Sequence, residues 1–123
     1  MIFIKDLKNC TPFLASDEST LLELLHPDRE KMALQIGFSL AHALVKPGQS
    51  TLPHKLKTSV ELYYILAGEG IIHIGNESAS VCPGQIVYIP PDSKQSIRNT
   101  GDGDLTFLCL VSPPWKGEDE TVG

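Results

Sequence analysis

The sequence lacks any long hydrophobic run. No stretch of its 123 residues approaches the about 18 apolar residues that a membrane-spanning helix needs. The N-terminal segment MIFIKDLKNC contains neither a basic segment followed by a long apolar one nor a site typical of leader cleavage. We therefore predict no export and no membrane partner, and we expect a cytoplasmic protein.

Positive charge and paired cysteines are also scarce. The formal net charge is −5, and apart from an acidic C-terminal end the two signs are interspersed, so no basic stripe could follow a phosphate backbone. Nucleic acid is therefore not an expected partner. The cysteines, Cys10, Cys82 and Cys109, are odd in number and form no C-x-x-C pair, which predicts reduced thiols instead of a disulfide framework.

Motifs of nucleophilic and dinucleotide-dependent catalysis are missing. No serine lies in a G-x-S-x-G pattern. The stretch GEGIIHIG lacks the third glycine of G-x-G-x-x-G and connects two short strands instead of opening a helix, so it predicts a turn. The sequence gives no support for nucleophilic catalysis.

What is present predicts one all-β domain. The length is close to that of a single domain, and 41% hydrophobic residues suffice for folding without disulfides. From residue 33 onward, short β-prone runs alternate with Gly, Pro, Asn and Asp, which is typical of a barrel or sandwich. The expected strands are 34–45, 51–56, 61–67, 71–74, 78–81, 86–89, 95–99 and 105–111.

Two segments flank the expected barrel, which spans residues 34–112. Residues 1–33 are expected to be irregular or extended and to pack on the barrel or on a partner. Residues 113–123 form a tail that begins with prolines, and its acidic, glycine-flanked end is expected to be disordered.

Two of the expected strands are apolar on both faces. In 105–111, Phe107 and Cys109 point one way while Leu108 and Leu110 point the other, and 34–45 likewise carries large residues on one face and mostly small ones on the other. A small barrel buries only one face of each strand. The second face is then covered either by residues 1–33 or by a second copy, and we favour a homodimer.

A buried carboxylate is the main functional signal. Strand alternation places His54 and Leu56 on one face, and Glu61, Tyr63 and Ile65 on one face of the next strand. The apolar run YYIL predicts that this inward face belongs to the core. An unpaired carboxylate there costs several kcal/mol or becomes neutral, so a cation near Glu61 would offset the cost.

Two motifs resemble those of the cupin superfamily. PGQSTLPHKLKTSVELYYILAG fits G-x5-H-x-H-x3-4-E-x6-G, and PGQIVYIPPDSKQSIRN fits G-x5-P-x-G-x2-H-x3-N. The matching residues are Gly48, His54, Glu61, Gly68, Gly84, Pro90 and Asn99. The resemblance covers about half of the chain and implies a double-stranded β-helix, or jelly-roll, barrel of the conserved-barrel, mannose-6-phosphate-isomerase-like branch.

Three positions depart from the cupin pattern. Leu56 stands at the second histidine, Gln95 at the last histidine and Asp92 at the glycine of the second motif. The resemblance therefore implies a metal site reduced to His54 and Glu61, with Gln95 as a third ligand. The expected ion is divalent (Mn, Fe, Ni or Zn), and losing an imidazole shifts the preference toward harder ions such as Mn.

Two functions follow from these expectations. The first is a metal-dependent enzyme of isomerase, lyase or oxygenase type acting on a polar or sugar-like small molecule, with the catalytic Tyr63 hydroxyl as an acid, a ligand or a substrate contact. The alternative for Tyr63 is a core residue with a satisfied hydroxyl. The second is a metal-free binding or sensor protein whose buried polar groups hydrogen-bond to one another around a small-molecule ligand. A structural protein with a filled barrel is a third reading.

The other histidines are not expected to be ligands. His73 alternates with Ile72 and Ile74 and should face solvent, and His26 precedes a proline in the irregular segment. His42 lies on the large-residue face of its strand and should be a core histidine or line the same cavity as His54.

Overall fold

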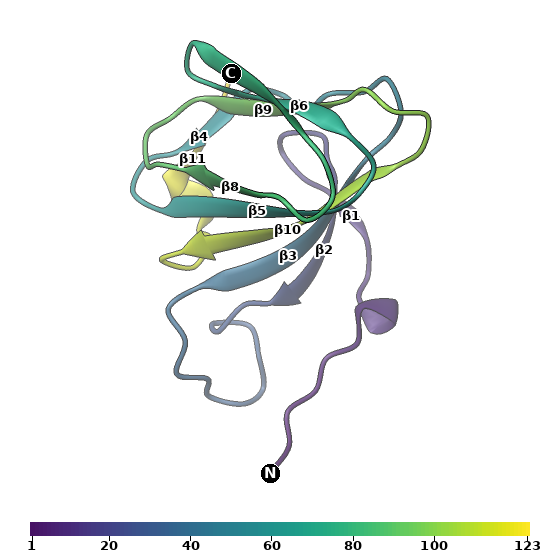
Figure 1. The fold of residues 1–123 in the computed structure, drawn as a ribbon. Coiled ribbons are helices and arrows are strands. Elements are labelled where there is room, and N and C mark those ends of the chain that lie inside the picture. Colours follow the sequence, from purple (N-terminus) through teal and green to yellow (C-terminus); the bar gives the residue numbers. More distant parts are fainter.

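A computed structural model describes all 123 residues and shows a barrel of two facing antiparallel sheets (Figure 1). Two 3-10 turns, Leu7–Asn9 and Gly117–Asp119, are the only helical elements. The strands are β1 Phe13–Leu14, β2 Thr20–Leu25, β3 Ser39–Val45, β4 His54–Leu56, β5 Val60–Ala67, β6 Gly70–Ile74, β7 Glu77–Val81, β8 Ile86–Ile89, β9 Gln95–Asn99, β10 Leu105–Ser112 and β11 Glu120–Val122. The predicted all-β jelly roll is confirmed.

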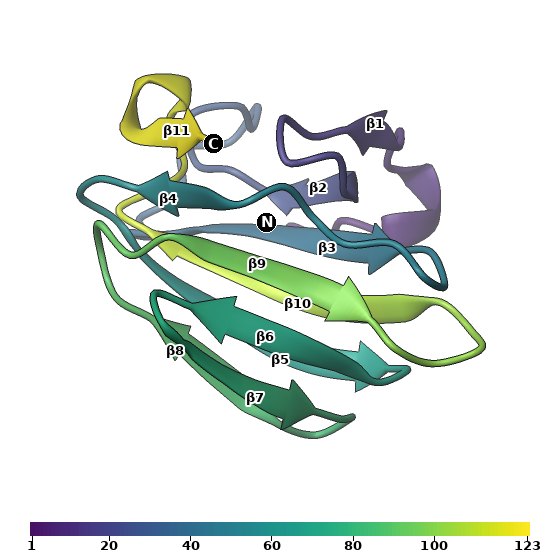
Figure 2. The ribbon, with the colours of Figure 1, turned by 90° about the horizontal axis from the view of Figure 1, so that it is seen from above.

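The six-stranded sheet has the order β1-β2-β3-β10-β5-β8, and the five-stranded sheet has the order β11-β4-β9-β6-β7. The view from above shows the two sheets lying over one another (Figure 2). The six strands from β5 to β10 agree with the predicted ranges to within one residue at each end. β4 begins only at His54 because Pro53 has no N–H for a ladder, and Thr51 and Leu52 donate instead to Ile97 and Asp17.

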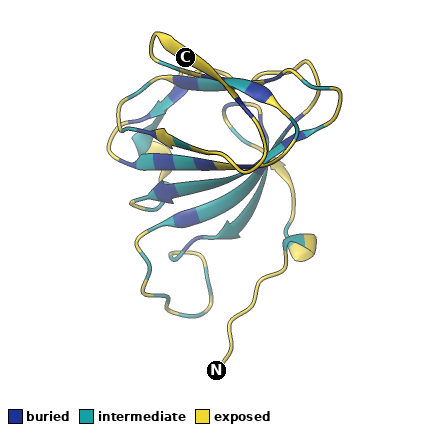
Figure 3. Ribbon diagram, in the orientation of Figure 1, coloured by how far each residue is buried: buried dark blue, intermediate teal, exposed yellow.

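The N-terminal segment is more regular than the sequence predicted. Its second half forms β2, which pairs antiparallel with β3, and β1 pairs with β2 in a hairpin. Leu21 on β2 packs against the hydrophobic core, which explains why this run is a strand. Beyond the hairpin, the N-terminal residues run away from the barrel and are exposed (Figures 1 and 3).

The prediction of a disordered C-terminal end is wrong. β11 pairs antiparallel with β4 along its whole length. The carboxylate of Asp119 accepts hydrogen bonds from the Thr58 backbone N–H and hydroxyl at 2.9 and 2.7 Å and from the Ser59 N–H at 3.1 Å. The acidic composition that predicted disorder therefore supplies the contacts that hold the tail on the barrel.

The hydrophobic core lies between the two sheets. Ile65, Ile97 and Leu105 are fully buried there, each contributing on the order of 1.5–3 kcal/mol to folding. The motif glycine Gly68 closes the β5–β6 turn with a φ of 84°, and a Cβ at this position would lie 2.6 Å from the Asp104 carbonyl oxygen. Glycine is therefore required at this turn.

Alternation along β3 settles the position of His42. Ala41 and Ala43 point inward and line a cavity, so His42 lies on the outer face between Leu22 and Leu108, and it neither lines the cavity nor belongs to the core. His73 is exposed, in agreement with the prediction. No helix of the structure is long and apolar enough to cross a membrane.

Candidate ligand-binding site

A cavity of about 380 Å³ lies where the barrel, the N-terminal hairpin and the C-terminal tail meet. This volume is within the range of small-molecule sites. The barrel contributes polar and aromatic side chains to its inner wall, namely His54, Glu61, Tyr63, Phe107 and Cys109. The hairpin and the tail cover it, and their lining residues include Phe13, Leu14, Ser16, Asp17, Trp115 and Glu120.

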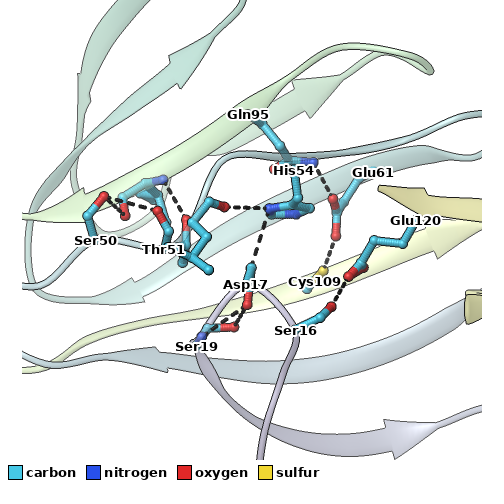
Figure 4. Close-up of polar contacts among 12 residues, drawn as sticks. Ser16, Asp17, Ser19, Ser50, Thr51, His54, Glu61, Gln95, Cys109 and Glu120 are labelled. Carbon is cyan, nitrogen blue, oxygen red and sulfur yellow. Dashed lines mark hydrogen bonds and ion pairs between the residues drawn. The ribbon is translucent and has the colours of Figure 1, made fainter. Parts of the chain in front are cut away.

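Glu61 is the centre of a hydrogen-bonded cluster on the inner wall (Figure 4). Its side chain is buried, and its Oε1 accepts a hydrogen bond from Gln95 Nε2 at 2.5 Å. Its Oε2 accepts from the Cys109 thiol, also at 2.5 Å. Tyr63 donates its hydroxyl hydrogen to Gln95 Oε1 at 2.8 Å. The carboxylate is thus stabilised inside the barrel by neutral donors from β9 and β10.

Burial shifts the pKa values of the cluster in one direction. It raises the pKa of Glu61, although the Cys109 hydrogen bond and the nearby His54 act to lower it. Burial also raises the pKa of Tyr63 and of Cys109 well above their ordinary values, and the Glu61 charge adds to both effects. Tyr63 and Cys109 are therefore hydrogen-bond donors near neutral pH, and Cys109 is not a reactive thiolate.

His54 occupies the wall next to this cluster. Its Nδ1 lies 3.1 Å from the Leu52 carbonyl oxygen and 3.6 Å from Asp17 Oδ2. Asp17 is carried by the loop between β1 and β2, and its carboxylate points toward the His54 ring (Figure 4). Asp17 was not predicted as a site residue, because it lies in a segment interpreted as irregular and no motif spacing connects it with His54.

The tail closes the cavity through Trp115 and Glu120. Glu120 accepts hydrogen bonds from the Ser16 hydroxyl and, at 3.0 Å, from Trp115 Nε1. The Trp115 backbone N–H donates to the hydroxyl oxygen of Ser39 on β3 at 2.9 Å. The hairpin, the barrel and the tail are therefore joined at one point above the cavity. Neither Glu120 nor Cys109 was identified from the sequence as a site residue.

A second set of contacts holds the loop after β2 against the tail. The guanidinium of Arg29 lies 5.7 Å from the centre of the Trp115 ring and 2.6 Å from a carboxylate oxygen of Glu23. The His26 ring is buried, and a hydrogen bond of 2.8 Å joins its Nε2 to the Trp115 carbonyl oxygen. His26 is therefore a structural residue outside the cavity wall, and Arg29 is the only arginine or lysine that lines the cavity.

The inner-wall residues fit a closed hydrogen-bonded cluster better than a metal site. Gln95 turns its amide nitrogen toward Glu61 and its oxygen toward Tyr63, so the two oxygen ligands expected for an ion do not point at a common centre. Leu56 is buried at the position of the missing histidine. No group of three or more His, Cys, Asp or Glu side chains has an arrangement that could hold a metal ion. The metal-ligand roles of His54, Glu61 and Gln95 stay a prediction.

The sequence comparisons identify relatives of this chain. It is 42% identical over 111 residues to the uncharacterized protein MJ1618 of Methanocaldococcus jannaschii, a match that covers 90% of this chain and 86% of the relative. It is 35% identical over 71 residues to the oxalate-binding protein of Thermotoga maritima, which covers 58% of this chain and 59% of that protein.

The solved structures agree with these relatives. A predicted oxalate decarboxylase from Thermotoga maritima superposes with a TM-score of 0.79 at 27% identity, covering 90% of this chain and 99% of that one. Residues 41–111 match the cupin domain family, so the resemblance seen in the two motifs is confirmed at the level of the superfamily, while the mannose-6-phosphate-isomerase-like branch is not. The chain belongs to the cupin domain family.

Proposed function

We propose that this protein binds a small, uncharged or cationic molecule rich in hydrogen-bond donors, such as a polyol or an amine, without a resident metal ion. The observation that carries the proposal is the state of the polar groups around the cavity. Most donors on the inner wall are already used within the protein, whereas the carboxylate oxygens keep lone pairs that can accept further hydrogen bonds.

The donors are used as follows. The Tyr63, Gln95 and Cys109 side chains donate to one another or to Glu61. The Ser16 hydroxyl and the Trp115 indole N–H both donate to Glu120. At the rim, one N–H of Arg29 donates to Glu23, and the remaining guanidinium N–H groups make no hydrogen bond within the protein. A carboxylate ligand would find few free donors at the inner wall, whereas a hydroxyl or ammonium group would find acceptors.

The charges that line the cavity also favour an uncharged or cationic ligand. Four carboxylates line the cavity, those of Asp17, Glu23, Glu61 and Glu120, against one guanidinium and one imidazole. Two like charges at 4 Å repel by about 1 kcal/mol in water and by about 4 kcal/mol at the effective dielectric of a protein surface. The apolar part of the wall, which includes Trp115 and Phe107, suits the carbon skeleton of a polyol or an amine.

The names of two relatives make oxalate the obvious ligand to compare. One is an oxalate-binding protein and the other a predicted oxalate decarboxylase. In this chain, oxalate would bring two negative charges beside Glu61 and Asp17, and it has no hydrogen to donate to them. We therefore expect oxalate to bind poorly unless a divalent cation accompanies it.

The competing function is the metal-dependent isomerase, lyase or oxygenase with Tyr63 as a catalytic acid. It is supported by the position of His54 and Glu61, which line the same cavity. It requires Gln95 to release both Tyr63 and Glu61 and to turn its oxygen toward the ion. The resemblance to mannose-6-phosphate-isomerase-like cupins belongs with this function.

The test is a ligand screen by thermal unfolding, with polyols, primary amines and oxalate, each with and without Mn²⁺. A polyol or an amine should raise Tm without metal, because a ligand that binds only the native state stabilises it. Ala41→Leu, which fills the cavity from β3 and changes no polar group, should abolish the shift. Stabilisation by oxalate alone, or a polyol shift that persists in Ala41→Leu, would contradict the proposal.

Elemental analysis of untagged protein separates the metal-dependent function from the metal-free one. Stoichiometric metal that is lost in both His54→Ala and Glu61→Ala would establish the metal site and support the enzyme alternative. If the metal-free arrangement holds, the wild type should carry no bound metal after supplementation. Gln95→His restores the family's imidazole and should tighten the binding of added Mn²⁺ or Ni²⁺, since the residue faces Glu61.

We also propose a homodimer formed through the outer face of the six-stranded sheet. Two cross-strand rows of uncharged side chains run over this face and consist of Leu22, His42, Leu108, Tyr64 and Ile86, and of Leu40, Leu110, Leu62 and Tyr88. Tyr64, Ile86 and Tyr88 are between 44% and 64% exposed. β1 and β2 extend the sheet beyond β3, and the other six side chains of these rows are half-buried. An exposed apolar patch of this kind is typical of an interaction site.

A second copy fits this face because the rows contain no charge. Two chains of net charge −5 can meet there without opposing carboxylates. Leu108→Asp should convert the dimer to a monomer in analytical ultracentrifugation, while Ser78→Asp on the exposed strand β7 of the other sheet should not. A monomeric wild type, or a dimer that tolerates Leu108→Asp, would disprove this interface.

A further inference from the structure

We infer that Asp17 is a positioning residue that fixes the His54 ring with its Nε2 lone pair toward the cavity. The geometry brings the hairpin to the barrel wall at this point. Asp17 Oδ2 lies 3.6 Å from His54 Nδ1, and both residues are buried, at 8% and 4% exposure. The inference deepens the proposed function, because it names the atom that would receive a donor of the ligand.

The partners of Nδ1 determine which ring nitrogen carries the hydrogen. The Leu52 carbonyl oxygen, at 3.1 Å, can only accept a hydrogen bond, and the Asp17 carboxylate can only accept one as well. Two acceptors on the same side require Nδ1 to be the donor. In the neutral ring, Nε2 then holds the lone pair.

The other side of the ring is open to the cavity. Nε2 makes no hydrogen bond within the protein. Every fully buried side-chain nitrogen or oxygen of the protein has a hydrogen-bond partner, so Nε2 is not one of the fully buried atoms. It is therefore accessible, and since His54 lines the cavity and is almost fully buried, the access is from the cavity. A hydroxyl or ammonium group of a ligand can donate to Nε2 from there.

Asp17 is held rigidly enough to act in this way. Its Oδ1 accepts from the Ser19 N–H at 3.0 Å and the Ser19 hydroxyl at 2.6 Å. Its carbonyl accepts from the Leu52 N–H at 2.7 Å, which joins the hairpin to the residue that also contacts His54. Glu18 completes the tight loop with a φ of 70°. The second carboxylate oxygen of Asp17 is thereby fixed beside the imidazole.

The experiment is nitrogen-15 NMR of the histidine rings, which reports the tautomer without any ligand. In the wild type, His54 should show the Nδ1–H tautomer. Asp17→Asn keeps the loop hydrogen bonds through the amide oxygen but places an N–H₂ donor against Nδ1, so the population with hydrogen on Nε2 should rise several-fold. Glu18→Gln removes a charge from the same loop without a contact to His54 and should leave the tautomer unchanged.

A second readout is the rate of carbethoxylation of His54 by diethyl pyrocarbonate, followed by peptide mass analysis, with the exposed His73 as internal reference. His54 should react in the wild type and several-fold more slowly in Asp17→Asn. An Nε2–H tautomer in the wild type, or a tautomer and rate that Asp17→Asn leaves unchanged, would overturn the inference. Neither readout uses a ligand, so a failed ligand screen and a failed positioning role are distinguishable.

Discussion

The two ends of the barrel interior are made by the same strands and differ in chemistry. Along β5, the inward residues change from Glu61 through Tyr63 to Ile65, and along β9 they change from Gln95 to Ile97. At the polar end, side chains hydrogen-bond to side chains around a cavity. At the apolar end, side chains such as Ile65 and Ile97 pack against one another, and the fold gains most of its stability there.

Asn99 shows what a purely structural polar residue looks like in this barrel. It lies at the apolar end of β9, fully buried, and its amide donates to the Val45 and Gly103 carbonyls while its oxygen accepts from the Gly101 N–H. All its partners are backbone atoms of loops and strand ends. The Glu61 cluster instead consists of side chains beside open space, so its composition can change without altering the path of the chain.

The largest effect should follow from truncating the apolar end. Ile65→Ala removes a fully buried side chain from β5, four residues after Glu61, and should lower the free energy of unfolding by about 2–5 kcal/mol. Urea unfolding measures this change. If Ile65→Ala lowered the free energy of unfolding by less than the polar-end variants do, stability would not be concentrated at the apolar end.

Breaking the polar cluster should have the next largest effect. Gln95→Leu leaves the Tyr63 hydroxyl and one Glu61 oxygen without partners, at a cost of about 1–3 kcal/mol for each unsatisfied group. Gln85→Leu, at an exposed amide that accepts one bond from the Cys82 N–H, is the matched control and should cost less. If Gln95→Leu and Gln85→Leu lowered the free energy of unfolding equally, the buried cluster would contribute no more to stability than an exposed hydrogen bond.

Removing the contact that holds the tail should have a moderate effect that depends on pH. Burial acts to raise the pKa of Asp119, but the hydrogen bonds from Thr58 and Ser59 outweigh it and lower the pKa below 3.8. This stabilisation is present above the ordinary pKa and is lost as pH falls through the folded-state value. Asp119→Ala should therefore cost about 1 kcal/mol at neutral pH.

Unfolding of Asp119→Ala and wild type at pH 7 and at strongly acid pH checks this sign. The difference between the two proteins should shrink at the lower pH. The neighbouring Glu118→Ala, at an exposed carboxylate, should give no difference at either pH. A cost for Asp119→Ala that is independent of pH would show that the hydrogen bonds do not depend on the charge.

Glu61→Gln should have a pH dependence opposite to that of Asp119→Ala. Because burial raises the pKa of Glu61, its contribution is fully present below about 4.5 and is lost as pH rises through the folded-state value. The variant should therefore gain in stability relative to the wild type as pH rises from 4 to 8. A constant difference in urea unfolding across this range would argue against a raised pKa.

The inward-facing residues of the barrel could be predicted from the sequence, because strand alternation and the cupin motif spacing both relate residues that are close together in the chain. Glu61, Tyr63 and Gln95 face inward in the structure because the side-chain period of a strand is two residues. The covering elements were not predictable in this way. Asp17 and Glu120 reach the cavity from opposite ends of the chain, and their positions depend on the tertiary path, which leaves no periodic signal.

The prediction for the tail failed for a related reason. Acidic residues between glycines are typical of disorder when they have no partners. In this chain Asp119 meets the N–H groups of Thr58 and Ser59 in the turn before β5, a pairing across the fold that composition does not encode. The same limitation applies to Cys109, which was predicted to be a reduced thiol on the same strand face as Phe107 but not a donor to Glu61.

The covering hairpin and tail lie outside residues 41–111, the part of the chain that matches the family. Two cupins can therefore share every barrel strand and still differ in the pieces that decide what fits inside. Searches for proteins that hold the same molecule as this one are best guided by the short loop around Asp17 and the Trp115–Glu120 segment. If the proposed function holds, exchanging those two segments between relatives is expected to change which molecule binds while the barrel strands stay the same.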